Sequence, residues 1–359
     1  MKRKLCFVIS SMRRGGAERV MSLLLNSAID KGNEVHLILL SDSRIDYDLN
    51  SQINVIRLAD DLHGVRYIKN IKRFSILKKK LVGINPDLVV SFLTICNIFV
   101  AMALKNTKIP FIVSERNDPI KDCPSAVKRL LRNHYYRYAD GVIFQTKDAK
   151  EYFSEKIQKK SSVIPNPVKS NLPFAEIGSE KKKIVAAARL MSQKNYPMML
   201  KAFKIFLEDH EDYTLHIFGD GNLKNELISL TNELDISQNV CFEGNVNDLH
   251  DRIKDARMFV LSSDYEGISN SLLEALAMGL PCISTDCPCG GSKMLIENGV
   301  SGILTPVGDE TAFADAMKKI ADSRILAEQF SKNAMKIRDS FSEDVNIGKY
   351  FEYFEKILA

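Results

Sequence analysis

The sequence predicts an α/β protein made of two doubly wound domains, each a parallel sheet with helices on both faces. The chain has 359 residues, which is more than a single hydrophobic core usually supports. Short apolar runs alternate with stretches of helical periodicity along the whole chain. The runs are almost continuously apolar, which is typical of strands buried on both faces of a parallel sheet.

Six strands are expected in each half of the chain. Those of the first half cover residues 5–10, 34–41, 54–58, 87–93, 110–115 and 141–146, and those of the second cover 183–190, 214–221, 239–244, 258–263, 281–286 and 302–306. Helical patterns between them include residues 18–30, 196–208 and 271–278. In open parallel sheets, ligands bind beyond the carboxyl ends of the strands. The polar residues that follow each strand are therefore the candidates for function.

A linker is expected over residues 161–183, because this stretch contains three prolines and a charged run before a new strand. We place the boundary near residues 166–169, which gives domains at 1–167 and 168–342. The last stretch, 343–359, has the pattern of an amphipathic helix with Phe351, Phe354 and Leu358 on one face. We expect this helix to pack back on the first domain.

Positive charge is concentrated in the first half of the chain. Residues 1–170 contain 30 Lys and Arg against 16 Asp and Glu, while the remainder contains 20 against 29. This asymmetry indicates that the first half meets something anionic. Nucleic acid, a phospholipid surface and a phosphorylated substrate would all fit.

The cysteines and the N-terminal run argue for a cytoplasmic protein. The seven cysteines have no zinc-binding spacing, and Cys287 and Cys289 are too close for a C-x-x-C pair. We therefore expect reduced thiols. The basic start, Lys2–Lys4, precedes an apolar run of about seven residues without a cleavage site, which favours a strand over a signal peptide. No run approaches the ~18 apolar residues that span a bilayer.

Adjacent glycines, Gly15 and Gly16, follow the first expected strand and open a helix. Glycines at such a junction let the backbone approach a phosphate. The dinucleotide fingerprint is Gly-x-Gly-x-x-Gly, and this loop does not contain it. An NAD-dependent oxidoreductase needs that fingerprint and an acidic residue about 20 positions later. No expected strand is followed by both, so this function is disfavoured.

Two cations follow the first strand of the second half. Arg189 and Lys194 lie five residues apart after the run "KIVAAA". A planar guanidinium and a mobile ammonium at a strand's carboxyl end suit a diphosphate. A solvated loop is the alternative interpretation of the same residues.

Two carboxylates bracket a helix start later in the second half. Glu266 and Glu274 are eight residues apart, with Gly267 and a Ser-Asn-Ser run between them. The helix is expected to begin near residue 271, with Ser269 or Asn270 as its cap, so that its first N–H groups form an anion site. The flanking carboxylates can accept hydrogen bonds from sugar hydroxyls. A capped helix with surface acids is the alternative.

Taken together and in this order, these motifs resemble those of the retaining glycosyltransferases of family 4. The stretch from Glu266 to Glu274 matches the family's Glu-x7-Glu signature. Arg189 to Lys194 matches its G-R-L-x-x-x-K-N element, with Ala188 in the glycine position. The adjacent glycines, "IPNPV" and "FGDGNLKNELISL" match as well. The resemblance implies the GT-B fold, two Rossmann-like domains facing across a cleft, with the nucleotide sugar held mainly by the second.

The resemblance also implies roles for individual residues. Glu274 would hold the ribose hydroxyls, Glu266 would bind the donor sugar, and Arg189 and Lys194 would neutralise the departing diphosphate. The remaining donor contacts would come from Gly15, Gly16, Asn245, Gly267, Ile268, Ser269 and Asn270. Fixed cations and helix N–H groups stabilise the charge that develops on the leaving oxygen.

One position departs from the family pattern. Many relatives place a histidine after the fourth or fifth strand of the first domain, where this chain has "VSERNDP". Arg116 occupies the approximate position, and a permanent cation cannot act as a base. Arg116 would then contact a phosphate, and Glu115 would be the acceptor-side base. A local ion pair between the two is the alternative.

The resemblance implies a UDP-sugar as donor substrate, with no metal and no cofactor. One acidic triplet, Asp46-Tyr47-Asp48, has the Asp-x-Asp pattern of some metal sites. It lies in a polar stretch between expected strands, where we interpret it as solvated surface.

A basic amphipathic pattern in the first half suggests contact with an anionic membrane. Over residues 64–83, Arg66, Lys69, Lys72, Arg73 and Lys78–Lys80 gather opposite Tyr67, Ile68, Ile71, Phe74, Leu77 and Leu81. Such helices are typical of membrane surfaces. Residues 128–138 add a second basic stretch with aromatics. Similar enzymes often act on saccharides carried by undecaprenyl diphosphate at the cytoplasmic membrane face. Ordinary packing with a solvated basic face is the alternative.

The sequence therefore predicts a retaining, metal-independent glycosyltransferase that moves a hexose or N-acetylhexosamine from a UDP-sugar to a lipid-linked saccharide. Capsule, O-antigen or related glycan synthesis is the expected setting, with the protein peripheral on the inner membrane face and no nucleic acid as partner. A non-catalytic sugar-nucleotide or nucleic-acid-binding protein and a sugar-nucleotide epimerase are the alternatives. The donor sugar, the linkage and the oligomeric state are open.

Overall fold

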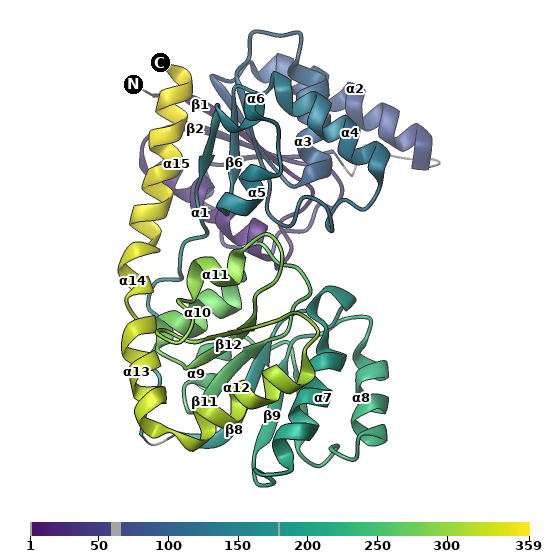
Figure 1. Ribbon diagram of the computed structural model, residues 1–359. Helices are drawn as coiled ribbons and strands as arrows, with labels where there is room; N and C mark the ends of the chain where they lie inside the picture. The colour runs from purple at the N-terminus through teal and green to yellow at the C-terminus, as the bar shows by residue number, and fades with distance from the viewer. Residues whose placement is uncertain (1, 59–65, 179) are drawn as a thin grey trace. The chain divides into compact units, whose positions relative to one another are not determined.

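The computed structural model describes residues 2–58, 66–178 and 180–359, with side chains in the second stretch described from residue 72 onward. The chain divides into two compact units, Met1–Pro167 with Asp344–Ala359, and Val168–Glu343. Each unit contains one parallel sheet covered by helices on both faces (Figure 1). The expected α/β class with two Rossmann-like sheets is confirmed.

In the described residues, the sheet of the first unit has seven strands in the order β3-β2-β1-β4-β5-β6-β7. The order reverses between β1 and β4, and in open sheets such a switch point marks a ligand-binding edge. The strands are β1 (Lys4–Ile9), β2 (Glu34–Leu39), β3 (Asn54–Arg57), β4 (Leu88–Phe92), β5 (Phe111–Ser114), β6 (Gly141–Phe144) and β7 (Ser161–Val163). The helices are α1 (Gly16–Asp30), α2 (Arg66–Ile84), α3 (Thr94–Leu104), α4 (Ala126–Tyr135), the 3-10 turn η1 (Tyr136–Tyr138), α5 (Lys147–Glu151), α6 (Glu155–Gln158) and α15 (Glu343–Leu358).

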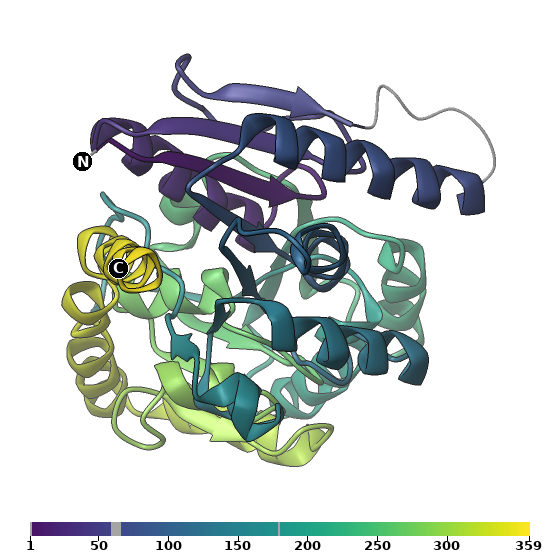
Figure 2. The same ribbon diagram turned by 90° about the horizontal axis from the view of Figure 1, so that it is seen from above.

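The two faces of this first sheet carry different helices. Leu5, Phe7 and Ile9 alternate along β1 and pack into one core with residues of α1 and α15. Helices α2, α3 and α4 lie side by side on the opposite face (Figure 2). None of the helices in the described part of the chain is long and apolar enough to cross a bilayer.

The sheet of the second unit has six strands among the described residues, in the order β10-β9-β8-β11-β12-β13. Ile184 and Ala186 of its strand β8 join one core, while Val185 and Ala187 join the core on the other face. The strands are β8 (Lys181–Ala187), β9 (Thr214–Phe218), β10 (Val240–Gly244), β11 (Ala256–Leu261), β12 (Cys282–Thr285) and β13 (Ile303–Thr305). The helices are the 3-10 turn η2 (Ser192–Lys194), α7 (Tyr196–Leu207), α8 (Lys224–Glu233), α9 (Leu249–Ile253), α10 (Asn270–Met278), α11 (Gly291–Leu295), α12 (Glu310–Asp322), α13 (Arg324–Ala334) and α14 (Ile337–Ser340).

Two elements differ from what the sequence pattern predicts. Strand β7 lies inside the stretch expected to be a linker, because a short edge strand can form from partly exposed polar residues that give no apolar run. In α15, the buried residues are Asn346, Ile347, Tyr350, Tyr353 and Phe354. Of the three residues expected on its apolar face only Phe354 is buried, while Phe351 and Leu358 are partly buried against the same core. Tyrosines whose hydroxyls find partners account for the shift.

Candidate active site

In the second unit, the loop after β8 is fastened to the loop after β11. The Ser262 hydroxyl donates to the Lys194 carbonyl at 2.7 Å, and the Asp264 N–H donates to the Gln193 carbonyl at 2.9 Å. Asn195 has a left-handed backbone (φ 43°), caps α7 by accepting from the Met198 N–H at 3.2 Å, and donates to Asp264 at 2.6 Å. These bonds fix the backbone on both sides of Lys194.

Lys194 and Glu266 form an ion pair at this edge of the sheet. Their side chains are 10% and 12% exposed, and the Ser263 hydroxyl also donates to the Glu266 carboxylate, at 3.3 Å. The structure therefore brings together two residues that lie 72 positions apart in the sequence and that were both predicted as catalytic. A pair this well desolvated is strongly coupled, so losing either partner leaves a costly buried charge.

Arg189 also follows β8, and its side chain is exposed. Within the described residues, it makes no side-chain hydrogen bond or ion pair. Its guanidinium thus keeps all five N–H donors for a ligand, whereas the ammonium of Lys194 is shared with Glu266.

Helix α10 begins at Asn270, one residue earlier than predicted, with Ser269 at its N-cap position. The Ser269 side chain makes no capping hydrogen bond to the helix and instead lies 3.1 Å from the Ser271 hydroxyl. Ser269 therefore occupies the predicted cap position, but its side chain does not make the capping hydrogen bond. The helix ends at Gly279, whose left-handed backbone (φ 87°) suits a C-terminal cap.

Gly291 explains how the loop before α10 is held. A Cβ atom at Gly291 would overlap the carbonyl group of Gly267, so only glycine lets these two backbones meet. Gly267, Ile268 and Ser269 are buried at this contact, while Asn270 is partly exposed. The segment "CGGSK" thus packs against the backbone that is predicted to bind the donor. Sequence analysis gave the glycines of this segment no role.

Glu274 is almost buried and pairs with His250, whose Nε2 lies 2.9 Å from the carboxylate. His250 lies on α9, close after Asn245, which is exposed in the loop that follows β10. Sequence analysis missed this histidine. Its position beyond a strand's carboxyl end is the signal that would have found it.

In the first unit, Gly15 is the N-cap residue of α1, and Gly16 is exposed at the first helical position. The Tyr47 hydroxyl accepts from the Gly15 N–H at 3.1 Å and donates to the Gly15 carbonyl at 2.8 Å. The Asp46 carboxylate accepts from the Arg14 N–H at 3.1 Å. Asp46 and Asp48 are exposed, as the interpretation of this triplet as solvated surface predicts, and Asp46 and Tyr47 in addition brace the glycine loop.

Glu115 lies in a buried polar cluster directly after β5. Its side chain is 2% exposed and accepts hydrogen bonds from Tyr136 and Thr94, while fully buried Arg132 lies 3.9 Å away. Burial raises the pKa of this carboxyl group, and the nearby Arg132 opposes that shift. The ion pair of Glu115 is therefore with Arg132 rather than Arg116. These contacts favour a structural role for Glu115 over acceptor-side base.

Arg116 connects the end of β5 to the last helix of the chain. It donates to the Tyr350 hydroxyl at 2.7 Å and to Asn166, and its guanidinium stacks 4.6 Å from the ring centre of Phe92. Most of its side-chain contacts are thus within the first unit. Arg116 belongs to the first unit, whereas Arg189 and Lys194 belong to the second.

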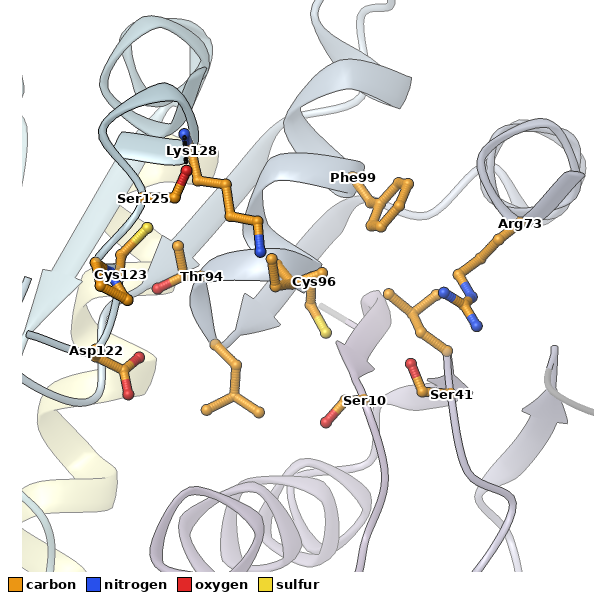
Figure 3. Close-up of a pocket in the computed structure, with 14 residues that line it drawn as sticks. Ser10, Ser41, Arg73, Thr94, Cys96, Phe99, Asp122, Cys123, Ser125 and Lys128 are labelled. Carbon is orange, nitrogen blue, oxygen red and sulfur yellow. Dashed lines mark hydrogen bonds between the residues drawn. The ribbon is translucent and has the colours of Figure 1, made fainter. Parts of the chain in front are cut away.

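A pocket of about 440 Å³ lies at the switch point of the first sheet. Ser10 and Ser41 line it where β1 and β2 end, and Thr94 lines it where α3 starts. Lys128 of α4 and Arg73 of α2 reach toward it from opposite sides (Figure 3). Its other described lining residues are Leu40, Leu93, Ile95, Cys96, Phe99, Asp122, Cys123, Pro124 and Ser125. Two cations and several hydroxyls suit a ligand that carries both phosphate and sugar groups.

The described residues show no disulfide and no cluster suited to a metal ion. All seven cysteines are free. Burial raises the pKa of Cys287, close to Glu266, to about 12, so its thiol stays protonated at neutral pH. Among the described residues, no group of three or more His, Cys, Asp or Glu side chains could hold a metal ion.

The fold defines a class of α/β protein with two Rossmann-like units, in which candidate functional residues follow the carboxyl ends of the strands. Two family models match adjacent parts of the chain. "Glycosyltransferase Family 4" matches residues 14–172, and "Glycosyl transferases group 1" matches residues 169–337. The chain belongs to the family 4 glycosyltransferases, as its motifs predict, and it is a glycosyltransferase.

Relatives extend over nearly the whole chain. An uncharacterised glycosyltransferase of Methanocaldococcus jannaschii is 29% identical, covering 81% of this chain and 82% of its own. The GalNAc-alpha-(1->4)-GalNAc-alpha-(1->3)-diNAcBac-PP-undecaprenol alpha-1,4-N-acetyl-D-galactosaminyltransferase of Campylobacter jejuni is 28% identical, covering 99% and 98%. HepE of Anabaena, solved in complex with UDP, matches with a TM-score of 0.82 at 16% identity, covering 98% and 100%. The likeness to HepE, at this low identity, shows the fold alone.

Proposed function

We propose that this protein is a retaining glycosyltransferase that moves a hexose or N-acetylhexosamine from a UDP-sugar to an undecaprenyl-diphosphate-linked saccharide. The observation that carries the donor site is the Lys194–Glu266 pair at the carboxyl edge of the second sheet, with the exposed Arg189 in the same loop after β8. Support for the donor comes from HepE, whose structures hold UDP and UDP-glucose. Support for the acceptor comes from the Campylobacter relatives, whose names specify undecaprenyl diphosphate-linked saccharides.

In this proposal, the chemistry depends on charge held in place before reaction. The bond between the sugar C1 and the diphosphate oxygen breaks, and the acceptor hydroxyl oxygen bonds to C1 from the same face. The hydroxyl proton passes to the departing diphosphate. Arg189 binds that diphosphate with its fork of donors, and Lys194 adds a cation whose position Glu266 fixes. No step needs a metal ion, and we propose that none is used.

Other residues position the donor. Glu274 accepts hydrogen bonds from the ribose hydroxyls, and His250 orients its carboxylate. The backbone from Gly267 to Asn270 supports the sugar and phosphate, and Asn245 contacts the base. Gly16 offers its backbone N–H to the diphosphate, while Gly15 lets the loop backbone approach it and is fixed by Tyr47.

We place the acceptor in the pocket at the switch point of the first sheet. Arg73 and Lys128 reach toward it from opposite sides and suit a phosphate group, while Ser10, Ser41 and Thr94 offer hydroxyls to a saccharide (Figure 3). An acceptor with both kinds of group fits this lining. The lipid carrier implies that the protein works peripherally at the inner face of the cell membrane.

The test is a donor panel with membrane lipid extract as acceptor source, read out as released nucleoside diphosphate. Wild type is compared with Arg189→Ala, Glu274→Gln and, as a matched acidic control, Glu233→Gln on the exposed side of α8. Lipid-dependent UDP release from one UDP-sugar, lost in the first two variants and kept in the third, is the expected result. Addition of EDTA should leave the rate unchanged.

Two results would contradict the proposal. Binding of a UDP-sugar without release, even with short saccharide acceptors, would leave a sugar-nucleotide-binding protein. Conversion of the free UDP-sugar to its epimer without an acceptor would indicate an epimerase. The anomeric configuration of the isolated product, measured by NMR, separates retention from inversion.

A further inference from the structure

Helix α4 carries its apolar side chains outward and its buried charge inward. Val127, Leu130 and Leu131 are 66%, 71% and 44% exposed. Arg132 on the same helix is fully buried, with Nη1 donating to the Pro119 carbonyl at 2.7 Å. A helix that covers a sheet normally has the opposite arrangement, with its apolar stripe against the core.

The exposed apolar residues form one stripe. Val127, Leu130, Leu131 and His134 recur at helical spacing on α4 and fall within an arc of about 100°, and Tyr138 follows in η1. His134 and Tyr138 are also in ring contact, with centroids 5.5 Å apart. We call these five residues the α4 stripe. Exposed apolar side chains gathered on one helix face mark an interaction surface, whereas scattered ones do not.

Basic residues border the stripe. Lys128 and Arg137 lie on its two sides and are exposed, and the Lys105 ammonium lies 5.7 Å from the ring centre of Tyr138. The segment from Ala126 to Tyr138 contains no Asp or Glu. An apolar stripe between cations complements a surface with negative charge outside and hydrocarbon beneath it.

The position of the stripe agrees with such a surface. Ser125 and Lys128, at the start of α4, line the pocket at the switch point of the first sheet. On the same face of that sheet, α3 separates α4 from α2, whose Lys72, Lys78, Lys79 and Lys80 are exposed (Figure 2). The stripe is thus next to the pocket, while the basic residues of α2 lie farther along the same layer of helices.

We propose that the α4 stripe inserts into the interfacial region of an anionic lipid bilayer, with Val127, Leu130 and Leu131 as the buried anchors. The choice of a bilayer as occupant rests on the proposed lipid-linked acceptor. The stripe then holds the mouth of the pocket at headgroup depth, where the diphosphate of a lipid carrier is located. The basic residues of α2 add long-range attraction, and α4 supplies the apolar contact.

The experiment uses the absence of tryptophan from this chain. Leu130→Trp introduces a single fluorescent reporter on the stripe, and Ile325→Trp introduces the same reporter at an 80% exposed site on α13. Both full-length variants are mixed with vesicles of phosphatidylglycerol and phosphatidylcholine, or of phosphatidylcholine alone. We expect a blue shift, and quenching by brominated lipids, only for the α4 reporter and mainly with the anionic vesicles.

Vesicle sedimentation then measures affinity. Leu130→Ser should weaken binding to anionic vesicles roughly tenfold, because an exposed leucine loses its apolar burial in lipid. Ile325→Ser is the matched control and should leave the affinity unchanged. Because both side chains are exposed, neither substitution should alter the thermal unfolding temperature. Lys78→Glu combined with Lys79→Glu should weaken binding at low salt and make it less sensitive to added salt, but leave the blue shift of the α4 reporter.

Unchanged emission of the α4 reporter, with equal sedimentation of Leu130→Ser and wild type, would overturn the inference. A concentration-dependent dimer that Leu130→Ser abolishes, without any lipid effect, would overturn it in favour of contact between copies of this chain. Neither result depends on turnover of a UDP-sugar. Conversely, vesicle binding without transferase activity would defeat the proposed function and leave the surface assignment intact.

Discussion

The two sheets of this protein both place charged residues after the carboxyl ends of strands, and the structure uses them differently. In the second unit, Lys194 and Glu266 pair at the sheet edge with about a tenth of each side chain exposed, and Arg189, earlier in the same loop as Lys194, is exposed. In the first unit, Glu115 follows β5 and is enclosed with Arg132 and Tyr136. The comparison teaches that a charged residue after a strand indicates a site only where some of its hydrogen-bonding capacity faces solvent.

The largest expected effect concerns the exposed cation. Arg189→Ala should lower kcat/KM for sugar transfer by about 10²- to 10³-fold, because it removes a preorganised charge from the leaving group. Its unfolding temperature should stay that of wild type, since within the described chain the side chain has no partner to lose. Lys194→Ala should reduce both kcat/KM and the unfolding temperature, because it leaves the Glu266 carboxylate unpaired. Nucleotide release assays and thermal unfolding together would measure this contrast. Equal activity in Arg189→Ala and wild type would contradict the distinction between the exposed charge after β8 in the second sheet and the enclosed charges after β5 in the first.

The next effect belongs to the buried cluster of the first unit. Glu115→Ala should lower the free energy of unfolding by about 3–5 kcal/mol, because it leaves Arg132 buried without its ion-pair partner. Urea unfolding measures this loss, and Glu115→Gln should recover part of it by keeping hydrogen bonds to Thr94 and Tyr136. If Glu115→Gln instead kept full stability and lost transfer activity, Glu115 would be a base after all.

A smaller effect is expected at the second carboxylate. His250→Ala should raise KM for the donor about tenfold with little change in kcat, because it loosens a carboxylate that binds the nucleotide equally in substrate and transition state. The double variant with Glu274→Gln should be no worse than Glu274→Gln alone. Additive losses would mean that His250 contacts the donor by a separate route.

The smallest effect sharpens the comparison through pH. Partial burial lowers the pKa of Lys160 from 10.5 to about 8, although its ammonium donates to the carbonyls of Arg137 and Ala139. Between pH 8 and 10.5, the unfolded chain therefore binds a proton that the folded chain has lost. The free energy of unfolding of wild type, relative to Lys160→Met, should rise with pH in that window, by about 1 kcal/mol after allowance for solvent screening. A flat difference would show that this lysine stays charged in the fold.

Sequence patterns predicted most of the fold, because buried parallel strands are nearly continuous apolar runs. They missed β7, where polar residues form a short edge strand, and they shifted the buried face of α15, where tyrosines supply core contacts. At the site, the motif spacing pointed to Lys194, Glu266 and Glu274. It did not reveal the partners His250 and Tyr47, since a pairing across loops depends on backbone geometry that spacing does not specify.

The sequence also did not show which residues at a strand end stay accessible. Glu115 and Glu266 both follow strands and precede polar residues, yet one is enclosed by an arginine, a tyrosine and a threonine drawn from other elements. Arg132 looked like part of a basic surface stretch, although it is fully buried. Its apolar neighbours Val127, Leu130 and Leu131 are instead exposed on α4.

Helix α15 has a consequence for how this protein is made. Its Phe354 packs 6.5 Å from the ring centre of Phe7 on β1, and its Tyr350 packs 6.3 Å from that of Phe92 on β4. These partners are translated well before α15, which follows the whole second unit in the chain. Domains normally fold in the order of synthesis. Here part of one apolar face of the first sheet stays uncovered while the second unit is made, so the nascent chain should depend on chaperones until α15 has emerged.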